Sequence, residues 1–142
     1  MRVIRCLMGV LLAASTSGAG ADGSHPCTRT GICRIEIKVD KSTTPCTAKA
    51  PEITVTRIAD NVPTLLLFDI DNRHSGAEFD STDGVKVSQG GGDHFEHLGR
   101  SSARIFLVID KNRANGDFPY EFKVSNDGRP CDPKDPMILN RN

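Results

Sequence analysis

Apolar and polar residues alternate one by one through most of this chain, and this alternation constrains its fold more than any other feature. In CRIEIKVD (33–40) every second residue is apolar and the residues between are charged. A period of two sends side chains alternately to the two faces of a β-strand, so the segment predicts a strand with one buried and one solvated face. EITVTRI (52–58) and PYEFKVS (119–125) repeat the pattern.

Four further segments complete the series. TLLLFDI (64–70) is almost continuously apolar, which indicates a strand that is covered on both faces or central in its sheet, and RIFLVID (104–110) is the second strongly apolar strand. GVKV (84–87) and PMILN (136–140) are short strands. Turn-forming pairs such as Asn-Gly and Asp-Gly separate the segments. We therefore predict an all-β fold, an antiparallel β-sandwich of about seven strands of the immunoglobulin-like or cupredoxin-like type.

The N-terminus has the pattern of an export signal. Arg2 and Arg5 precede a short apolar run, CLMGVLLAA, and small residues then lead to Ala21. About 20 apolar residues would be needed to span a bilayer, so a cleaved signal at 1–21 is favoured over an anchor. We expect a flexible segment at 22–31, a β-sandwich domain at 32–142, and a periplasmic or secreted location.

The charge balance argues against two classes of partner. The chain has 18 Lys and Arg against 18 Asp and Glu, and because the signal contains two arginines and no acid, the mature net charge is about −2. A near-neutral chain without a basic cluster is not expected to bind nucleic acid or an anionic membrane, or to insert into a membrane after signal cleavage. We expect a monomer that binds an unknown protein or envelope partner.

The cysteines indicate an oxidising compartment. Cys6 leaves with the signal, so four cysteines remain and can form two disulfides in three ways, among which the sequence does not choose. We prefer Cys27–Cys33, which closes a tight loop, and Cys46–Cys131, which ties the early chain to its end. A four-cysteine zinc site is disfavoured because no close CxxC pair is present.

The stretch SQGGGDHFEHLGR (88–100) contains the candidate metal ligands. Asp93, His94, Glu96 and His97 are the residue types that bind Zn²⁺, Ni²⁺ or Cu²⁺. In an extended strand the odd separation of the two histidines would send them to opposite faces, so convergence requires a special turn. A solvated loop or hairpin is the favoured interpretation, weak metal binding is the alternative, and His74 is a possible third imidazole.

Other chemistries have less support. DKNRANGDFPYE (110–121) places Asp110, Asn112 and Glu121 like the ligands of a calcium loop, but its glycine is displaced by one position, so a hairpin turn is favoured. The chain has no GxSxG elbow for a nucleophilic serine. It has no Trp and one Tyr, which argues against a carbohydrate-binding aromatic platform. We therefore expect no catalytic residues and no cofactor.

Three motifs, CTAKAPEITVTR, NRANGDFPYEFKV and CDPKDPMILN, resemble a group of small exported bacterial proteins with a cupredoxin-like β-sandwich, without copper ligands, and ending in Cys…Asp-Pro-x-Ile-x-Asn. The resemblance runs from about Cys46 to Asn140, and it implies a Cys46–Cys131 disulfide. The chain departs from the group in lacking tryptophan.

A blue-copper site is not expected despite that resemblance. Such a site takes two imidazoles, a thiolate and usually a methionine, several of them from the loop between the last two strands. Here that loop, SNDGRPCDPKDP, has no histidine, and its cysteine is better explained as a disulfide partner. The sequence thus indicates an exported, non-enzymatic β-sandwich with a binding or structural role, whose edge strands or end loops contact a partner.

Overall fold

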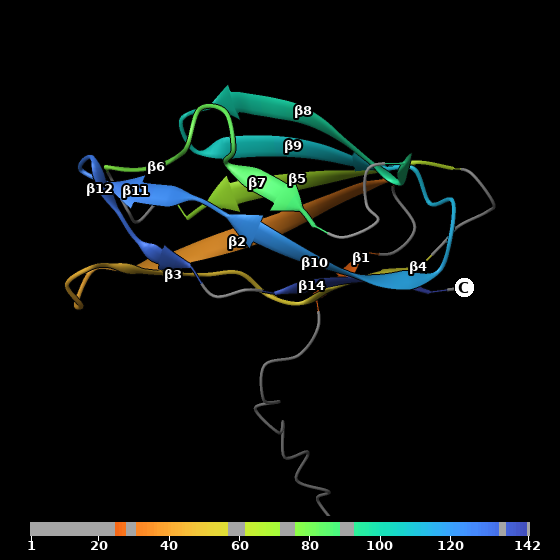
Figure 1. The fold of residues 1–142 in the computed structure, drawn as a ribbon, viewed down its shortest axis with the longest axis horizontal. Helices are drawn as coiled ribbons and strands as arrows, with labels where there is room; N and C mark the ends of the chain where they lie inside the picture. The colour runs from red at the N-terminus through yellow and green to blue at the C-terminus, as the bar shows by residue number, and fades with distance from the viewer. Residues whose placement is uncertain are drawn as a thin grey trace, which may run out of the picture.

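The computed structural model describes residues 25–27, 31–56, 62–71, 76–88, 93–133 and 136–141. These residues form a two-layered β-sandwich without an α-helix (Figure 1). No helix among them is long and apolar enough to cross a membrane. The expected signal peptide at 1–21, the glycines at 90–92 and His74 lie outside the described residues.

The strands are β1 (His25–Cys27), β2 (Ile32–Asp40), β3 (Thr47–Lys49), β4 (Ile53–Thr56), β5 (Thr64–Ile70), β6 (Ala77–Phe79), β7 (Val85–Val87), β8 (Phe95–Ser102), β9 (Ile105–Asp110), β10 (Gly116–Phe122), β11 (Val124–Asn126), β12 (Arg129–Pro130), β13 (Asp132–Pro133) and β14 (Met137–Arg141). One layer is a six-stranded sheet in the order β13-β3-β2-β5-β9-β8. A five-stranded sheet, β1-β4-β14-β10-β7, and a three-stranded sheet, β12-β11-β6, face it. Figure 1 shows β7 and β10 in front of the six-stranded sheet.

All seven segments with strand patterns are strands, so the all-β sandwich is confirmed. Most neighbouring strands pair antiparallel, as expected, but β2 pairs parallel with β5 and β4 pairs parallel with β14. The chain leaves β2 for β3 and β4 before it returns as β5, and a strand reached by such a crossover can run in the same direction as its neighbour. Alternation of side chains carries no information about strand direction.

Among the described residues, six strands lie outside the seven segments that the sequence predicts: β1, β3, β6, β8, β12 and β13. His25–Cys27, inside the segment 22–31, forms β1 and pairs parallel with β4. FEHLGRSS forms β8, which pairs with β9 at the edge of the six-stranded sheet. Only Phe95 of β8 is buried. A strand that packs one aromatic side chain into the core lacks the apolar alternation that identifies the others.

The core lies between the layers. The inward side chains of β2, β5 and β9 are mostly buried, and Phe68 of β5 lies 5.5 Å from Tyr120 of the facing sheet, measured between ring centroids. Tyr120 is fully buried and donates its hydroxyl hydrogen bond to the carbonyl oxygen of Pro51 at 2.9 Å. This bond satisfies the one polar atom of the side chain.

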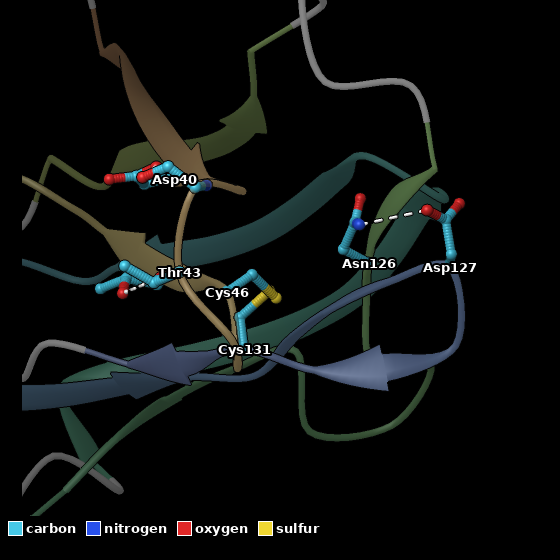
Figure 2. The surroundings of a disulfide bond; sticks show 8 residues. Asp40, Thr43, Cys46, Asn126, Asp127 and Cys131 are labelled. Carbon is cyan, nitrogen blue, oxygen red and sulfur yellow. Dashed lines mark hydrogen bonds between the residues drawn. A yellow bond between two sulfur atoms is a disulfide. The ribbon is translucent and has the colours of Figure 1, made fainter.

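Two disulfides link segments of the sandwich, in the preferred pairing. Cys27–Cys33 joins β1 of one layer to β2 of the other, with the Cα atoms 5.2 Å apart. Cys46–Cys131 joins residues 85 positions apart (Figure 2). Beside it, the backbone N–H of Asp132 donates to the carbonyl oxygen of Cys46. Paired cysteines are typical of proteins in oxidising, extracytoplasmic compartments.

Candidate functional site

The candidate metal ligands lie at the start of edge strand β8. Asp93 and His94 occupy the turn before the strand, and Glu96 and His97 are its second and third residues. Phe95 anchors the turn, because its ring is buried and meets Phe118 edge-on at 5.1 Å between centroids. With Phe95 directed into the core, alternation turns Glu96 outward and His97 toward the facing layer.

His97 connects the two layers. Its Nε2 accepts a hydrogen bond from the backbone N–H of Val87 on β7 at 3.2 Å. An imidazole nitrogen that accepts a hydrogen bond is unprotonated, so the ring is neutral and its proton is on Nδ1. Partial desolvation against β7 lowers the pKa of His97, and the nearby charge of Lys86 lowers it further. The lowered pKa and the hydrogen bond favour the same neutral form.

His94 has a different contact. Its ring packs against Phe118 with the centroids 5.3 Å apart, and its backbone carbonyl accepts from the N–H of Lys111. The expectation that strand geometry separates the histidines onto opposite faces does not apply, because β8 begins at Phe95 and His94 lies in the preceding turn. Both imidazoles contact the facing layer, one through a ring stack and the other through a hydrogen bond.

The two acidic residues of the stretch, Asp93 and Glu96, do not form a common site with the histidines. Asp93 and Glu96 are exposed, and Glu96 lies 3.8 Å from Lys111 in a surface ion pair. Among the described residues, no group of three or more His, Cys, Asp and Glu side chains is arranged to hold a metal ion. A site that includes His74 stays a prediction.

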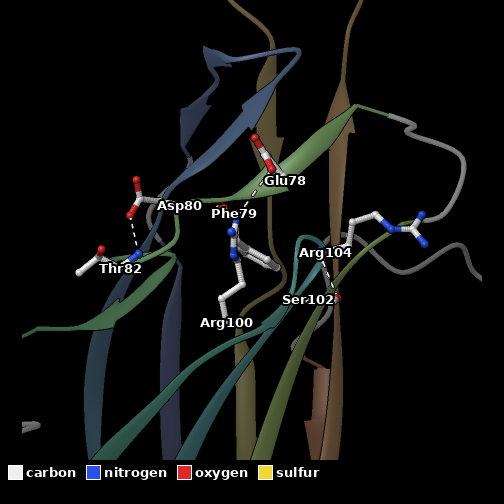
Figure 3. Close-up of polar contacts among 7 residues, drawn as sticks. All are labelled: Glu78, Phe79, Asp80, Thr82, Arg100, Ser102 and Arg104. Atoms are coloured by element: carbon white, nitrogen blue, oxygen red, sulfur yellow. Dashed lines mark hydrogen bonds and ion pairs between the residues drawn. The ribbon is translucent and has the colours of Figure 1, made fainter.

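Arg100 makes a second connection between β8 and the other layer. Its Nη1 donates to the carbonyl oxygen of Phe79 on β6 at 2.9 Å and lies 3.7 Å from the carboxylate of Glu78 (Figure 3). The backbone N–H of Phe79 donates in turn to the carbonyl oxygen of Ala103 at 2.8 Å. Together with His97, these contacts close the seam of the sandwich along β8.

The same strand is poorly suited to strand addition. The pairing of β8 with β9 shifts register between His97 and Gly99 and again between Arg100 and Ser102. Bulges and charged side chains on an edge strand disrupt the regular row of N–H and C=O groups that an incoming strand needs. Contact with a partner through this edge is therefore disfavoured.

The six-stranded sheet has a second candidate surface on the side away from the core. We call it the outer apolar face, and its members are outward side chains of β2, β5 and β9. They are Ile32, Leu65, Leu67, Ile105, Leu107 and Ile109. Ile32 is 57% exposed and the other five are half-buried.

Strand pairing makes these side chains contiguous. Leu65 pairs with Ile109, Leu67 pairs with Leu107, and Ile32 is the parallel neighbour of Leu65. Figure 1 shows β5 and β9 side by side, between β2 and β8. A monomeric protein rarely exposes a contiguous apolar patch without a use for it, so this face is a candidate binding surface.

Charged residues flank the outer apolar face on two sides. Along β2, Arg34, Glu36 and Lys38 point outward, and Arg34 forms an ion pair with Asp69 of β5. On the other side, Glu96 of β8 follows Ile109 in the same row. An apolar centre with a polar rim is the usual anatomy of a protein interface.

The sequence itself indicates this face, because its two most apolar strands are apolar on both sides. A central strand with one face in the core needs an apolar residue only at every second position, yet TLLLFDI and RIFLVID are apolar at both. The sequence predicts that TLLLFDI is either covered on both faces or central in its sheet. It is central, because β5 lies between β2 and β9. Its outward leucines are only half-buried.

The candidate calcium loop is a structural turn. Asp110 is fully buried, and its Oδ1 accepts from the backbone N–H of Asn112 at 2.9 Å and from Nδ2 of Asn140 at 3.2 Å. Glu121 is exposed on β10. The hairpin turn expected at 110–121 is wrong, because β9 and β10 belong to different sheets and the turn between them crosses from one layer to the other.

Comparison with known proteins leaves the family open. Neither a family model nor a curated protein matches the chain. A solved structure described as "NMR solution structure of copper binding protein in the apo form" aligns with a TM-score of 0.42 and 11% sequence identity over 85% of this chain and 100% of that chain. A likeness at this level supplies no argument about ligands or function.

Proposed function

We propose that this chain is an exported, non-enzymatic binding domain whose binding surface is the outer apolar face. One observation carries the proposal: leucine and isoleucine side chains on two adjacent central strands stay half-exposed, and no described segment covers them. Covering them would remove apolar surface from water, which is the dominant favourable term in most protein associations.

The expected strength follows from the size of the face. For a patch of about 300 Å², the lower end of the largest apolar patches on typical monomers, burial contributes about 7.5 kcal/mol at about 25 cal/mol per Å². Association costs at least about 4 kcal/mol in lost translational and rotational freedom. The remainder corresponds to a dissociation constant in the millimolar range, so polar contacts at the rim are needed for tighter binding.

Two further features support the rest of the proposal. The four cysteines outside the signal pattern are all in disulfides, so none of them is a free thiol nucleophile. The imidazole of His94 contacts Phe118 and that of His97 contacts Val87, both in the facing layer, and these are structural contacts. The disulfides and the signal pattern at 1–21 support export.

The accessibility of the face can be tested with an environment-sensitive dye. We expect 1-anilino-8-naphthalenesulfonate to bind the native, oxidised protein, and we expect Leu67→Ser combined with Leu107→Ser to reduce the bound fluorescence several-fold. Leu139→Ser is the matched control, because Leu139 is a half-buried leucine of β14 in the other layer. Equal dye binding by the double variant and the wild type, with circular dichroism unchanged, would overturn the proposal.

A further inference from the structure

We propose that a second copy of this chain covers the outer apolar face, so that two six-stranded sheets pack face to face in a symmetric dimer. The inference rests on the proposed function and names its partner. It replaces the monomer expected from the sequence. Two features of the face favour a second copy over a different protein: its apolar pattern and the charges at its rim.

The apolar pattern is self-complementary. Leu65 pairs with Ile109 and Leu67 pairs with Leu107, so the two rows are level across β5 and β9. A two-fold axis between these strands and parallel to them places β5 of each copy over β9 of the other. Leu65 then faces Ile109 and Leu67 faces Leu107 across the interface. Sheets that pack face to face lie about 10 Å apart and interdigitate such side chains.

The rim charges are compatible with the same symmetry. The axis brings the β2 rim of each copy against the β8 rim of the other. Ile32 and Glu96 share one row, so Glu96 of one copy lies opposite Ile32 of the other and one row from its Arg34. Within each chain Arg34 pairs with Asp69 and Glu96 pairs with Lys111, so the contact between the copies extends these two ion pairs across the rim. Opposite charges at the rim of an interface favour this orientation. With 18 basic and 18 acidic residues, the chain has no large net charge to drive copies apart.

The area predicts the strength. Strands β2, β5, β9 and β8 at about 4.8 Å spacing span about 19 Å, and six residues of β9 extend about 20 Å, which gives a projected area of about 400 Å². Stable interfaces bury about 800 Å² per partner. The face has about half of that area, so the dimer is expected to be weak and to dissociate on dilution.

The test measures mass against concentration. The exported chain, purified with both disulfides intact, is examined by sedimentation equilibrium from about 1 to about 500 μM, where a rise from the monomer mass toward twice that mass is expected. Leu67→Glu buries an acid beside the two-fold axis and should hold the protein at the monomer mass throughout. Leu139→Glu, on the other layer, is the matched control and should dimerise like the wild type.

Ile109→Glu is a second variant on the face, for use if Leu67→Glu fails to fold, and it should also be monomeric. A wild-type protein that stays monomeric at every concentration overturns the dimer, while dye binding to the exposed face would leave the proposed function standing. A dimer that persists in both face variants also overturns it, because the copies then meet through another surface. Absence of both dimer and dye binding removes both proposals.

Discussion

Lowering the pH should weaken the seam between β7 and β8 through one side chain, His97. Its Nε2 accepts the backbone N–H of Val87, and partial desolvation lowers its pKa in the folded protein below the value of about 6.5 in an unfolded chain. Between these two pKa values the unfolded state binds more protons than the folded state. Stability therefore rises with pH in this window, is fully present above pH of about 6.5, and is lost as the pH falls toward the folded pKa.

The size of the effect follows from the contact. Protonation converts Nε2 from an acceptor into a donor, so the hydrogen bond with Val87 is lost and two N–H groups face each other. A hydrogen bond of this kind contributes about 0.5–1.5 kcal/mol. With an unfolding entropy of about 2.1 cal/mol/K per residue, a domain of about 110 residues should lose roughly 2–6 °C of Tm.

Thermal unfolding followed by circular dichroism from pH 8 to pH 5 measures this loss. His97→Gln keeps an amide oxygen that can accept from Val87 but cannot be protonated, so its Tm should fall less over this range than that of the wild type. His97→Phe lacks an acceptor and should unfold earlier at pH 8. His94→Gln, which alters the neighbouring imidazole, should show the same loss of Tm between pH 8 and pH 5 as the wild type. Parallel pH profiles for the wild type and His97→Gln would refute the role assigned to His97.

Three further outcomes can be measured on the same protein. Asp110→Ala removes the acceptor of the Asn112 backbone N–H and of the Asn140 amide, and it should cost about 2–4 kcal/mol of unfolding free energy in urea, whereas the exposed Asp117→Ala should change little. Replacing Cys46 and Cys131 by serine should cost about 4–5 kcal/mol, and replacing Cys27 and Cys33 about 2 kcal/mol, because the first pair closes a loop of 85 residues and the second a loop of 6; equal losses would contradict the loop argument. Burial raises the pKa of Tyr120, which is the only tyrosine, so absorbance at 295 nm should show no phenolate at pH 10.5 until the protein unfolds, and stability should decline as the pH rises above about 10.

The local part of the fold was predictable because strand alternation is a local property. CRIEIKVD became β2 with the expected buried and exposed residues, and PYEFKVS alternates through Lys123 even though its neighbour changes there from β7 to β6. The same argument failed for FEHLGRSS. An edge strand that buries only Phe95 and is otherwise polar has no apolar period, and its pairing with β9 comes from the tertiary structure.

The candidate site was likewise predictable in its residue types but not in its three-dimensional arrangement. The residue types of DHFEHLGR suggested ligands, but composition does not determine where a side chain points. Because Phe95 occupies the core next to Phe118, Glu96 faces solvent and His97 faces Val87. The final Asn of the ending Cys…Asp-Pro-x-Ile-x-Asn has a role that only the tertiary structure shows: Asn140 is buried and donates a hydrogen bond to Asp110.

By itself, the sequence determined the all-β class, seven of the strand segments and the even set of cysteines outside the signal pattern, because side-chain period and residue type are readable one segment at a time. The tertiary structure alone decided that β2 and β5 run parallel, that β8 seals the seam, and that the outward leucines and isoleucines of β5 and β9 merge into one face. These depend on which segments become neighbours, and long-range pairing is set by the packing of the whole core.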